Sequence, residues 1–199
     1  LPAALETFYN VAEKVNAQIV HANGWYELTQ DEPEPIRQEN LNVKWEKYSI
    51  EGFLKFDPLY RLEEHWVPYK TWSMAWLCFC RRDFLEENKI EFLQMISEDE
   101  PFSMTLYCLA ERYYILHEVL YVYRKRTGSI MSTKNAEKFS KSIQSLAVGA
   151  IYLRNLFNRL PKFENYEQRC LQILNLFFDR MMRNHVNYYY ASETLQPEI

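Results

Sequence analysis

The chain of 199 residues is long enough for one domain, or for a domain with an appendage. Apolar residues make up 48% of it and aromatic residues 16%, which excludes a disordered chain. A net charge of −4 and only 4 glycines argue against a basic nucleic-acid-binding protein and against a glycine-rich phosphate-binding loop.

The first thirty residues predict a helix followed by a strand. Helical spacing of apolar residues predicts an amphipathic helix that ends at about Asn16. Its apolar face is expected to hold Leu5, Phe8, Tyr9, Ala12 and Val15. Residues 18–22 favour a short strand, with a turn at residues 23–24 and an extended segment beyond it. A helix followed closely by an apolar strand is typical of an α/β layer.

The central region predicts further mixed structure. Residues 72–80 favour a strand, and residues 82–88 have the charge pattern of a short helix. Residues 101–112 predict a helix that points Phe102, Leu106, Leu109 and Ala110 inward. Residues 113–116 and 119–123 favour two β segments.

The last third of the chain predicts a helical hairpin. Residues 142–158 and 166–188 are nearly free of Gly and Pro and are separated by Pro161. One apolar stripe contains Ile143, Leu146, Ala147, Ala150, Ile151 and Leu156, and the other contains Leu171, Leu174, Phe177, Phe178, Met181 and Met182.

Charge differs between the two parts of the chain. Residues 1–131 contain 14 basic and 21 acidic side chains, whereas residues 132–199 contain 9 basic and 6 acidic ones. This mildly basic tail permits peripheral contact with the inner face of an anionic membrane, although a solvated helix face explains it more simply.

The cysteines and histidines do not indicate a metal site. Cys78, Cys80, Cys108 and Cys170 form no pair of C-x-x-C units, and the four histidines lack ligand spacing. Apolar neighbours suit reduced, buried thiols, so we expect a cytoplasmic protein.

One acidic motif, Glu98-Asp99-Glu100-Pro101-Phe102, stands between an aromatic segment and a basic one. Sugar transfer needs a base for a hydroxyl, an apolar wall for a ring, and cations for a diphosphate. Asp99 is the candidate base, and a position at a helix N-terminus is expected to keep its carboxylate ionised. The alternative is that Asp99 only caps the helix.

The flanking segments supply the other two ingredients. Trp72 and Trp76 offer flat apolar faces that suit the C–H edges of a sugar, although core tryptophans would give the same pattern. Arg124, Arg126 and Ser129 can donate hydrogen bonds to phosphate oxygens. The alternative for this basic loop is solvated surface.

These ordered motifs resemble the second half of an inverting family 2 glycosyltransferase of the GT-A type. The resemblance is based on Glu98-Asp99-x-x-Phe102, on Arg81-Arg82 before a short helix, and on the Tyr-Arg-x-Arg-x-x-Ser-Ile run at residues 123–130. It implies an α/β fold, in which a partial GT-A layer is followed by a helical hairpin. Residues 1–131 would be the acceptor-side portion, and residues 132–199 a helical appendage.

The resemblance also implies roles and partners. Asp99 would deprotonate the acceptor, and Glu98, Trp72 and Trp76 would border it. Arg124, Arg126 and Ser129 would contact the donor phosphates. The partners would be a nucleotide sugar and a glycan or lipid-linked acceptor, in bacterial polysaccharide assembly.

Such enzymes hold Mg²⁺ or Mn²⁺ with an Asp-x-Asp motif, and this sequence contains none. The main metal ligand and the nucleotide-binding strands are therefore expected before Leu1, and the chain alone is expected to be inactive. The alternative is a non-catalytic domain that binds a partner protein or forms a homo-oligomer.

Overall fold

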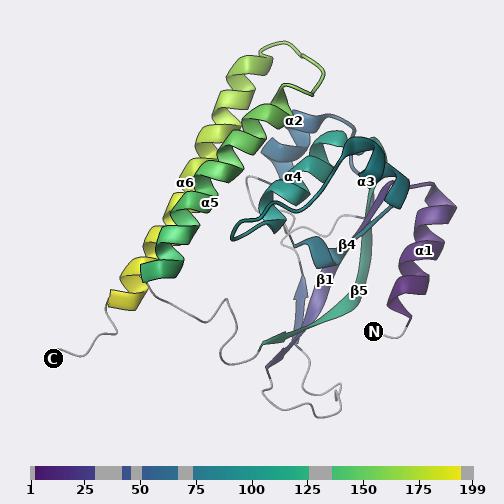
Figure 1. Ribbon diagram of the computed structural model, residues 1–199. Coiled ribbons are helices and arrows are strands. Elements are labelled where there is room, and N and C mark those ends of the chain that lie inside the picture. Colours follow the sequence, from purple (N-terminus) through teal and green to yellow (C-terminus); the bar gives the residue numbers. More distant parts are fainter. Residues whose placement is uncertain (1–2, 30–41, 46–50, 67–73, 126–135, 194–199) are drawn as a thin grey trace.

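The computed structural model describes residues 3–29, 42–45, 51–66, 74–125 and 136–193. The strands are β1 (Ile19–Thr29), β2 (Asn42–Trp45), β3 (Gly52–Phe53), β4 (Cys78–Cys80) and β5 (Tyr113–Lys125). The helices are α1 (Ala4–Val15), α2 (Pro58–Arg61), α3 (Arg82–Asn88), α4 (Asp99–Leu109), α5 (Ala136–Phe157) and α6 (Tyr166–Glu193), with a π-helical turn η2 (Leu62–Trp66) and a 3₁₀ turn η3 (Ala75–Leu77). Figure 1 shows, from left to right, the α5–α6 hairpin, α4, the sheet and α1.

The sheet has the strand order β2-β1-β5-β3, and β4 pairs with the first residues of β1. Strands β1 and β5 are parallel from Ile19↔Tyr113 to Thr29↔Lys125, whereas the other pairs are antiparallel. Successive strand residues point to opposite faces. Ile19, Tyr113 and Ile115 therefore join the core beneath α4 and the hairpin, while Val20, Ala22 and Leu116 join the core beneath α1.

Strand β1 is continuous where the sequence predicts a turn, so that prediction was wrong. Asn23 and Gly24 are both buried within the strand, and the pairing with β5 shifts register on either side of Gly24. An Asn-Gly pair suits a bulge as well as a hairpin turn, and here the long parallel partner keeps the chain extended. The two β segments predicted at 113–116 and 119–123 are likewise one strand, β5.

Helix α1 confirms the first predicted helix but covers less of the sheet than its stripe suggests. Phe8 and Ala12 are buried, and the ring of Phe8 stacks on Phe79 with 5.7 Å between centroids. Leu5 and Tyr9 are 73% and 57% exposed, contrary to expectation. The helix therefore rests on the sheet along one narrow line.

The aromatic segment before α3 is only partly a strand. Of its described residues, 75–77 form η3 and 78–80 form β4, so the prediction of a strand over 72–80 holds for its last three residues. Helix α3 confirms the predicted helix at 82–88.

Helix α4 confirms the helix predicted at 101–112, but it starts two residues earlier and ends three residues earlier, at Leu109. Every residue from 101 to 108 is buried, so this helix contacts protein on all sides. Its C-terminal end is held by Arg61, whose side chain is fully buried. The guanidinium donates through Nε to the carbonyl oxygen of Lys55, through Nη1 to those of Tyr107 and Ala110, and through Nη2 to those of Leu54 and Glu111.

The predicted hairpin is confirmed, although its helices are rotated from the predicted stripes. On α6 the buried line is Tyr166, Cys170, Ile173 and Phe177, whereas Leu171 is 61% and Phe178 is 41% exposed. On α5, Leu146, Ala150 and Leu153 are buried, whereas Ile151 is 63% exposed.

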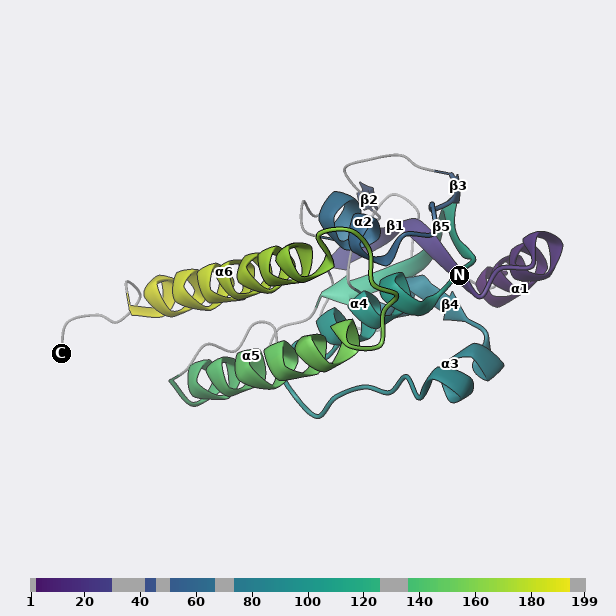
Figure 2. The ribbon, with the colours of Figure 1, turned by 90° about the horizontal axis from the view of Figure 1, so that it is seen from above.

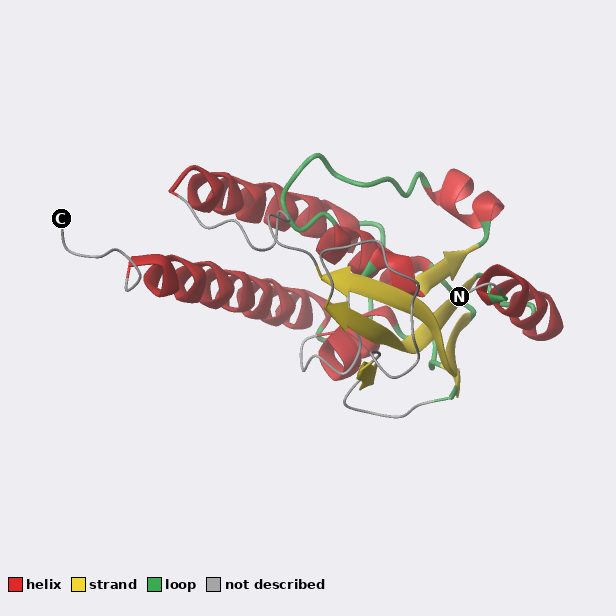
Figure 3. Ribbon diagram, turned by 90° about the horizontal axis from the view of Figure 1, so that it is seen from below, coloured by secondary structure: helices red, strands yellow, loops and turns green. Residues whose placement is uncertain are grey.

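Figures 2 and 3 show both long helices extending past the sheet. Of the helices described, none has the length and apolarity needed to cross a bilayer. The hairpin shares one core with α4 and the sheet, and a boundary at residues 131–132 stays a prediction.

Candidate functional site

Asp99 is the first residue of α4 and closely follows a turn of the backbone. Ser97 takes the left-handed conformation (φ 63°), which turns the backbone into the helix. Glu98 occupies the cap position with helical angles, and its side chain makes no capping hydrogen bond. Asp99 is the first helical residue, so it is not the N-cap residue of α4.

The carboxyl group of Asp99 is half-buried beside η3, where it accepts a hydrogen bond from the backbone N–H of Ala75. Burial and the negative charge of Glu98 raise the pKa of Asp99 to about 6, while the Ala75 hydrogen bond opposes that shift and Glu100 adds to it. We expected the helix N-terminus alone to favour ionisation; desolvation and like charge outweigh it. At neutral pH the carboxylate is still mostly ionised, with the pKa that a general base needs.

Trp76 follows Ala75 directly and lies in an aromatic cluster. Its ring stacks on Tyr121 and Tyr123, with centroids 4.4 and 5.4 Å away, and meets Trp25 edge-on at 5.6 Å. The side chain is half-buried. Trp76 is thus a core contact on one side, and a role for it in sugar binding stays a prediction. Trp72 lies outside the described residues.

Arg124 is exposed near the carboxyl end of β5, opposite Leu28 of the parallel strand β1. In open α/β sheets, ligands bind outside the carboxyl ends of parallel strands. Tyr121 and Tyr123 of the same strand stack on Trp76 of η3. Arg126 and Ser129 lie outside the described residues.

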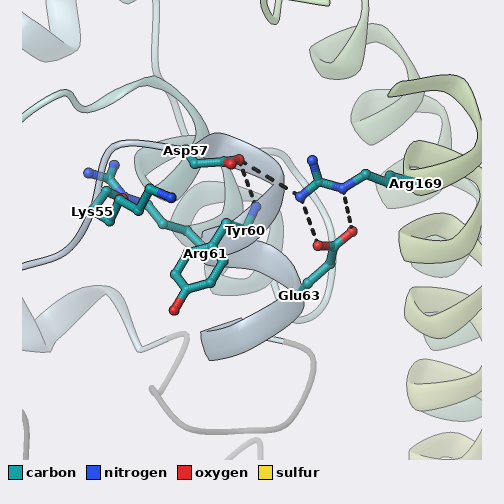
Figure 4. A network of polar contacts seen from close by, with 6 residues as sticks. All are labelled: Lys55, Asp57, Tyr60, Arg61, Glu63 and Arg169. Carbon is teal, nitrogen blue, oxygen red and sulfur yellow. Dashed lines mark hydrogen bonds and ion pairs between the residues drawn. The ribbon is translucent and has the colours of Figure 1, made fainter. Parts of the chain in front are cut away.

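The sequence interpretation missed a group of polar contacts that holds α2 and η2 against α6. Arg169 of α6 donates from Nε and Nη2 to the two carboxylate oxygens of Glu63 at 2.9 and 2.8 Å, and its Nη2 lies 3.9 Å from Asp57 (Figure 4). Asp57 also accepts from the backbone N–H of Tyr60 and so caps α2. Nothing in the local sequence pairs residue 63 with residue 169, since they belong to distant segments.

A second polar group lies within the sheet. His21 and Tyr113 are fully buried and share a 2.7 Å hydrogen bond, and the Cys78 thiol lies 3.9 Å from the Tyr113 hydroxyl. Burial raises the pKa of Tyr113 and, nearby, that of the Cys80 thiol. These groups favour their neutral forms, which suits structure better than nucleophilic chemistry.

A divalent metal fits the described residues poorly. Although Glu98, Asp99 and Glu100 are consecutive, no group of three or more His, Cys, Asp or Glu side chains within the described ranges is arranged to hold a metal ion.

The chain matches no protein-family model and no curated protein sequence. Its structure is similar to that of S. aureus TarS 1–349, solved in complex with UDP-GlcNAc, with a TM-score of 0.57 and 17% sequence identity. The similarity covers 89% of this chain and 45% of TarS 1–349, so the chain spans less than half of that protein. At this identity the similarity establishes the fold. The chain has a mixed α/β fold similar to that of TarS 1–349. An α/β part followed by a C-terminal helical hairpin is what the sequence predicts.

Proposed function

We propose that this chain is the acceptor-side part of a glycosyltransferase that moves a sugar from a nucleotide diphosphate to a glycan or lipid-linked hydroxyl, with inversion. The observation behind the proposal is the half-buried Asp99, whose pKa is raised to about 6 at the start of α4. The similarity of the fold to that of TarS, which was solved with UDP-GlcNAc, supports the same class of donor.

The proposed reaction is a single displacement. Asp99 takes the proton from the acceptor hydroxyl while the oxygen of that hydroxyl forms a bond to the anomeric carbon. The bond from that carbon to the phosphate oxygen breaks on the opposite face, and the nucleoside diphosphate leaves with the electron pair. Arg124, with Arg126 and Ser129, is proposed to bind the diphosphate, because guanidinium groups pair with phosphate oxygens.

The acceptor side is proposed to include Glu98, Trp76 and Trp72. Glu98 lies beside Asp99 and helps to keep the pKa of its carboxyl near neutrality. Mg²⁺ or Mn²⁺ is proposed to be bound by residues of the complete enzyme that this chain does not supply, so the chain alone is expected to be inactive.

The test is sugar transfer by the full-length protein. Asp99→Asn is expected to lower kcat by 10²- to 10⁴-fold, the usual effect of removing a general base. In the wild type, kcat/KM should fall tenfold per pH unit below about pH 6, where Asp99 becomes protonated. Asp83→Asn is the matched control, because Asp83 also lies in the first turn of a helix but is exposed and held by Arg81. Undiminished transfer by Asp99→Asn would refute the proposal.

A non-catalytic interaction domain is the second candidate, favoured by exposed apolar side chains on α6. Leu171, Phe178 and Met182 follow one another at spacings of seven and four, and are 61%, 41% and 39% exposed. Thermal stability measured with nucleotide sugar and Mn²⁺ separates the candidates. Ligand at a hundred times its Kd stabilises the folded state by about 2.7 kcal/mol. No shift for the full-length protein would favour the second candidate.

A further inference from the structure

The backbone just before Asp99 is tied to the helical hairpin. The N–H of Ile96 donates a 2.8 Å hydrogen bond to Oγ of Ser145 in α5, and Ser145 is only 5% exposed. This bond connects residues that are 49 positions apart. It also satisfies a partly buried N–H group in an irregular segment, where no helix or strand partner is present.

A second contact joins the same segment to the hairpin one turn further along α5. Gly149 faces the side chains of Met95 and Phe177: a Cβ built on it would lie 3.5 Å from Cε of Met95 and 3.0 Å from Cζ of Phe177. Met95 therefore packs where α5 and α6 meet. Two consecutive residues, 95 and 96, are thus fixed by the hairpin, one by packing and one by a hydrogen bond.

Only residues 97 and 98 separate this anchored point from Asp99. Ser97 is in the left-handed region, and the carbonyl oxygen of Glu98 already accepts the first helical hydrogen bond, from Phe102. The connection is too short to absorb a displacement of Ile96, so movement there reaches Asp99.

We infer that Ser145 is a positioning residue for Asp99, and that the α5–α6 hairpin helps to aim the carboxylate at its substrate. The inference rests on the proposed function and adds a residue from the last third of the chain to the site. Asp99 lies between two contacts that fix its position. One is the N–H of Ala75, and the other is the segment at residues 95–96 that the hairpin holds.

Replacing Ser145 can be read out through the pKa of Asp99, because the charged groups around Asp99 stay the same. The charged groups that act on Asp99 are Glu98 and Glu100, on its own element. From α5, the neutral Ser145 and the exposed Lys141 line the cavity beside residues 94–96, and from α2 Arg61 lies at the far end of α4. Removing the Ser145 hydroxyl thus changes no charge.

A half-open cavity of about 260 Å³ between residues 94–96 and α5 allows water to reach a loosened segment. Because burial is the main reason for the raised pKa of Asp99, loosening should lower that pKa toward the ordinary value. Misplacement of the carboxylate should lower kcat, with little change in the KM for the nucleotide sugar.

The experiment compares Ser145→Ala, Ser145→Thr and Tyr152→Phe in the full-length protein. Tyr152 is the matched control: its hydroxyl also joins α5 to α4, at 3.0 Å from Oγ1 of Thr105, but away from the segment before Asp99. Two quantities are measured, the pKa of Asp99 by NMR titration of its carboxyl carbon, and kcat for sugar transfer.

Ser145→Ala is expected to lower the pKa of Asp99 measurably and kcat by roughly 10- to 100-fold. Ser145→Thr, which keeps the hydroxyl, and Tyr152→Phe should stay within about threefold of the wild-type kcat and leave the pKa in place. The inference is overturned if Ser145→Ala leaves the pKa of Asp99 unchanged, or if Tyr152→Phe shifts both quantities equally. Failure of the proposed function looks different: Asp99→Asn would then retain transfer, while the titration would still show whether the hairpin controls the carboxyl.

Discussion

Replacing Arg61 tests how the C-terminal end of α4 is held. Arg61→Met keeps an unbranched apolar stem and removes all five N–H donors of the guanidinium. Three of the five carbonyl oxygens that accept from it are in fully buried hydrogen bonds, and two are in partly buried ones that water can reach.

The expected loss is worked from those three buried acceptors. Each buried acceptor left without its donor costs about 1–3 kcal/mol, and at the lower end of that range the three cost about 3–5 kcal/mol. Part of this loss is offset, because folding of the methionine variant does not require a charged group to be removed from water. We therefore expect a net loss of about 3 kcal/mol, a large part of the 5–15 kcal/mol typical of a domain.

The assay is equilibrium unfolding in urea, with Arg61→Lys as the informative companion. Lysine keeps the charge but has its donors on one atom, and one atom cannot reach carbonyls from both 54–55 and 107–111. Arg61→Lys should lose about 2 kcal/mol. Arg82→Met, at an arginine that is 90% exposed, is the control and should show no measurable change. Wild-type stability in Arg61→Lys would show that the positive charge, and not the planar geometry of the guanidinium, stabilises α4.

Three further predictions concern the hairpin and the site. The Arg169–Glu63 pair has two parallel hydrogen bonds and is only 24% and 30% exposed, so a double-mutant cycle in urea should give a coupling of about 1 kcal/mol. Asp99→Asn should stabilise the protein by about 1 kcal/mol at pH 7.5, after discounting for the solvent that reaches this carboxyl, and lose that advantage between pH 6 and pH 4. Gly149→Ala should destabilise the wild type by about 1 kcal/mol but not the Phe177→Leu variant, because the smaller side chain removes the 3.0 Å contact.

The predictions for the ion pair and for Asp99 each have an outcome that would contradict them. For the ion pair, the exposed Arg183–Asp179 pair of α6 is the reference. Equal coupling energies in the two pairs would show that burial does not strengthen the Arg169–Glu63 pair. For Asp99, the sign follows from its raised pKa: the folded state binds the proton more tightly than the unfolded state between pH 4 and pH 6, so ionisation above pH 6 destabilises the fold. Lower stability of the Asn variant at pH 7.5 would show that the carboxylate is a stabilising group.

The helices could be predicted from sequence because their information is local. Apolar spacing identified α1, α4, α5 and α6, and the charge pattern identified α3. Apolar spacing did not show which edge of each apolar stripe is buried. On α6 the buried line includes Tyr166 and Cys170, which a ranking by hydrophobicity passes over in favour of Leu171 and Phe178. Burial there is decided by where α5 and the sheet lie, and the sequence does not state that.

The strands and the polar contacts could be predicted less well. Asn23-Gly24 was wrongly interpreted as a turn because the pairing of β1 with β5 joins residues about ninety positions apart. Arg61 gave no signal, since its acceptors are main-chain oxygens, which every residue possesses. Asp99 could be identified by its motif, yet its raised pKa depends on η3, which approaches it only in the fold.

Different groups fix the two ends of helix α4. Arg61 holds the C-terminal carbonyl groups with buried hydrogen bonds, so its loss should be seen in the free energy of unfolding. Ser145 and the Ala75 N–H hold the N-terminal end, where the half-buried carboxyl of Asp99 lowers stability at neutral pH. A base kept partly out of water favours the neutral form of its own side chain, and the protein tolerates this because the rest of the helix is buried and fully anchored. Variants at the two ends should therefore have different effects. Replacing Arg61 should lower the free energy of unfolding and leave the pKa of Asp99 unchanged in the folded protein. Replacing Ser145 should change the pKa of Asp99, with a smaller change in the free energy of unfolding.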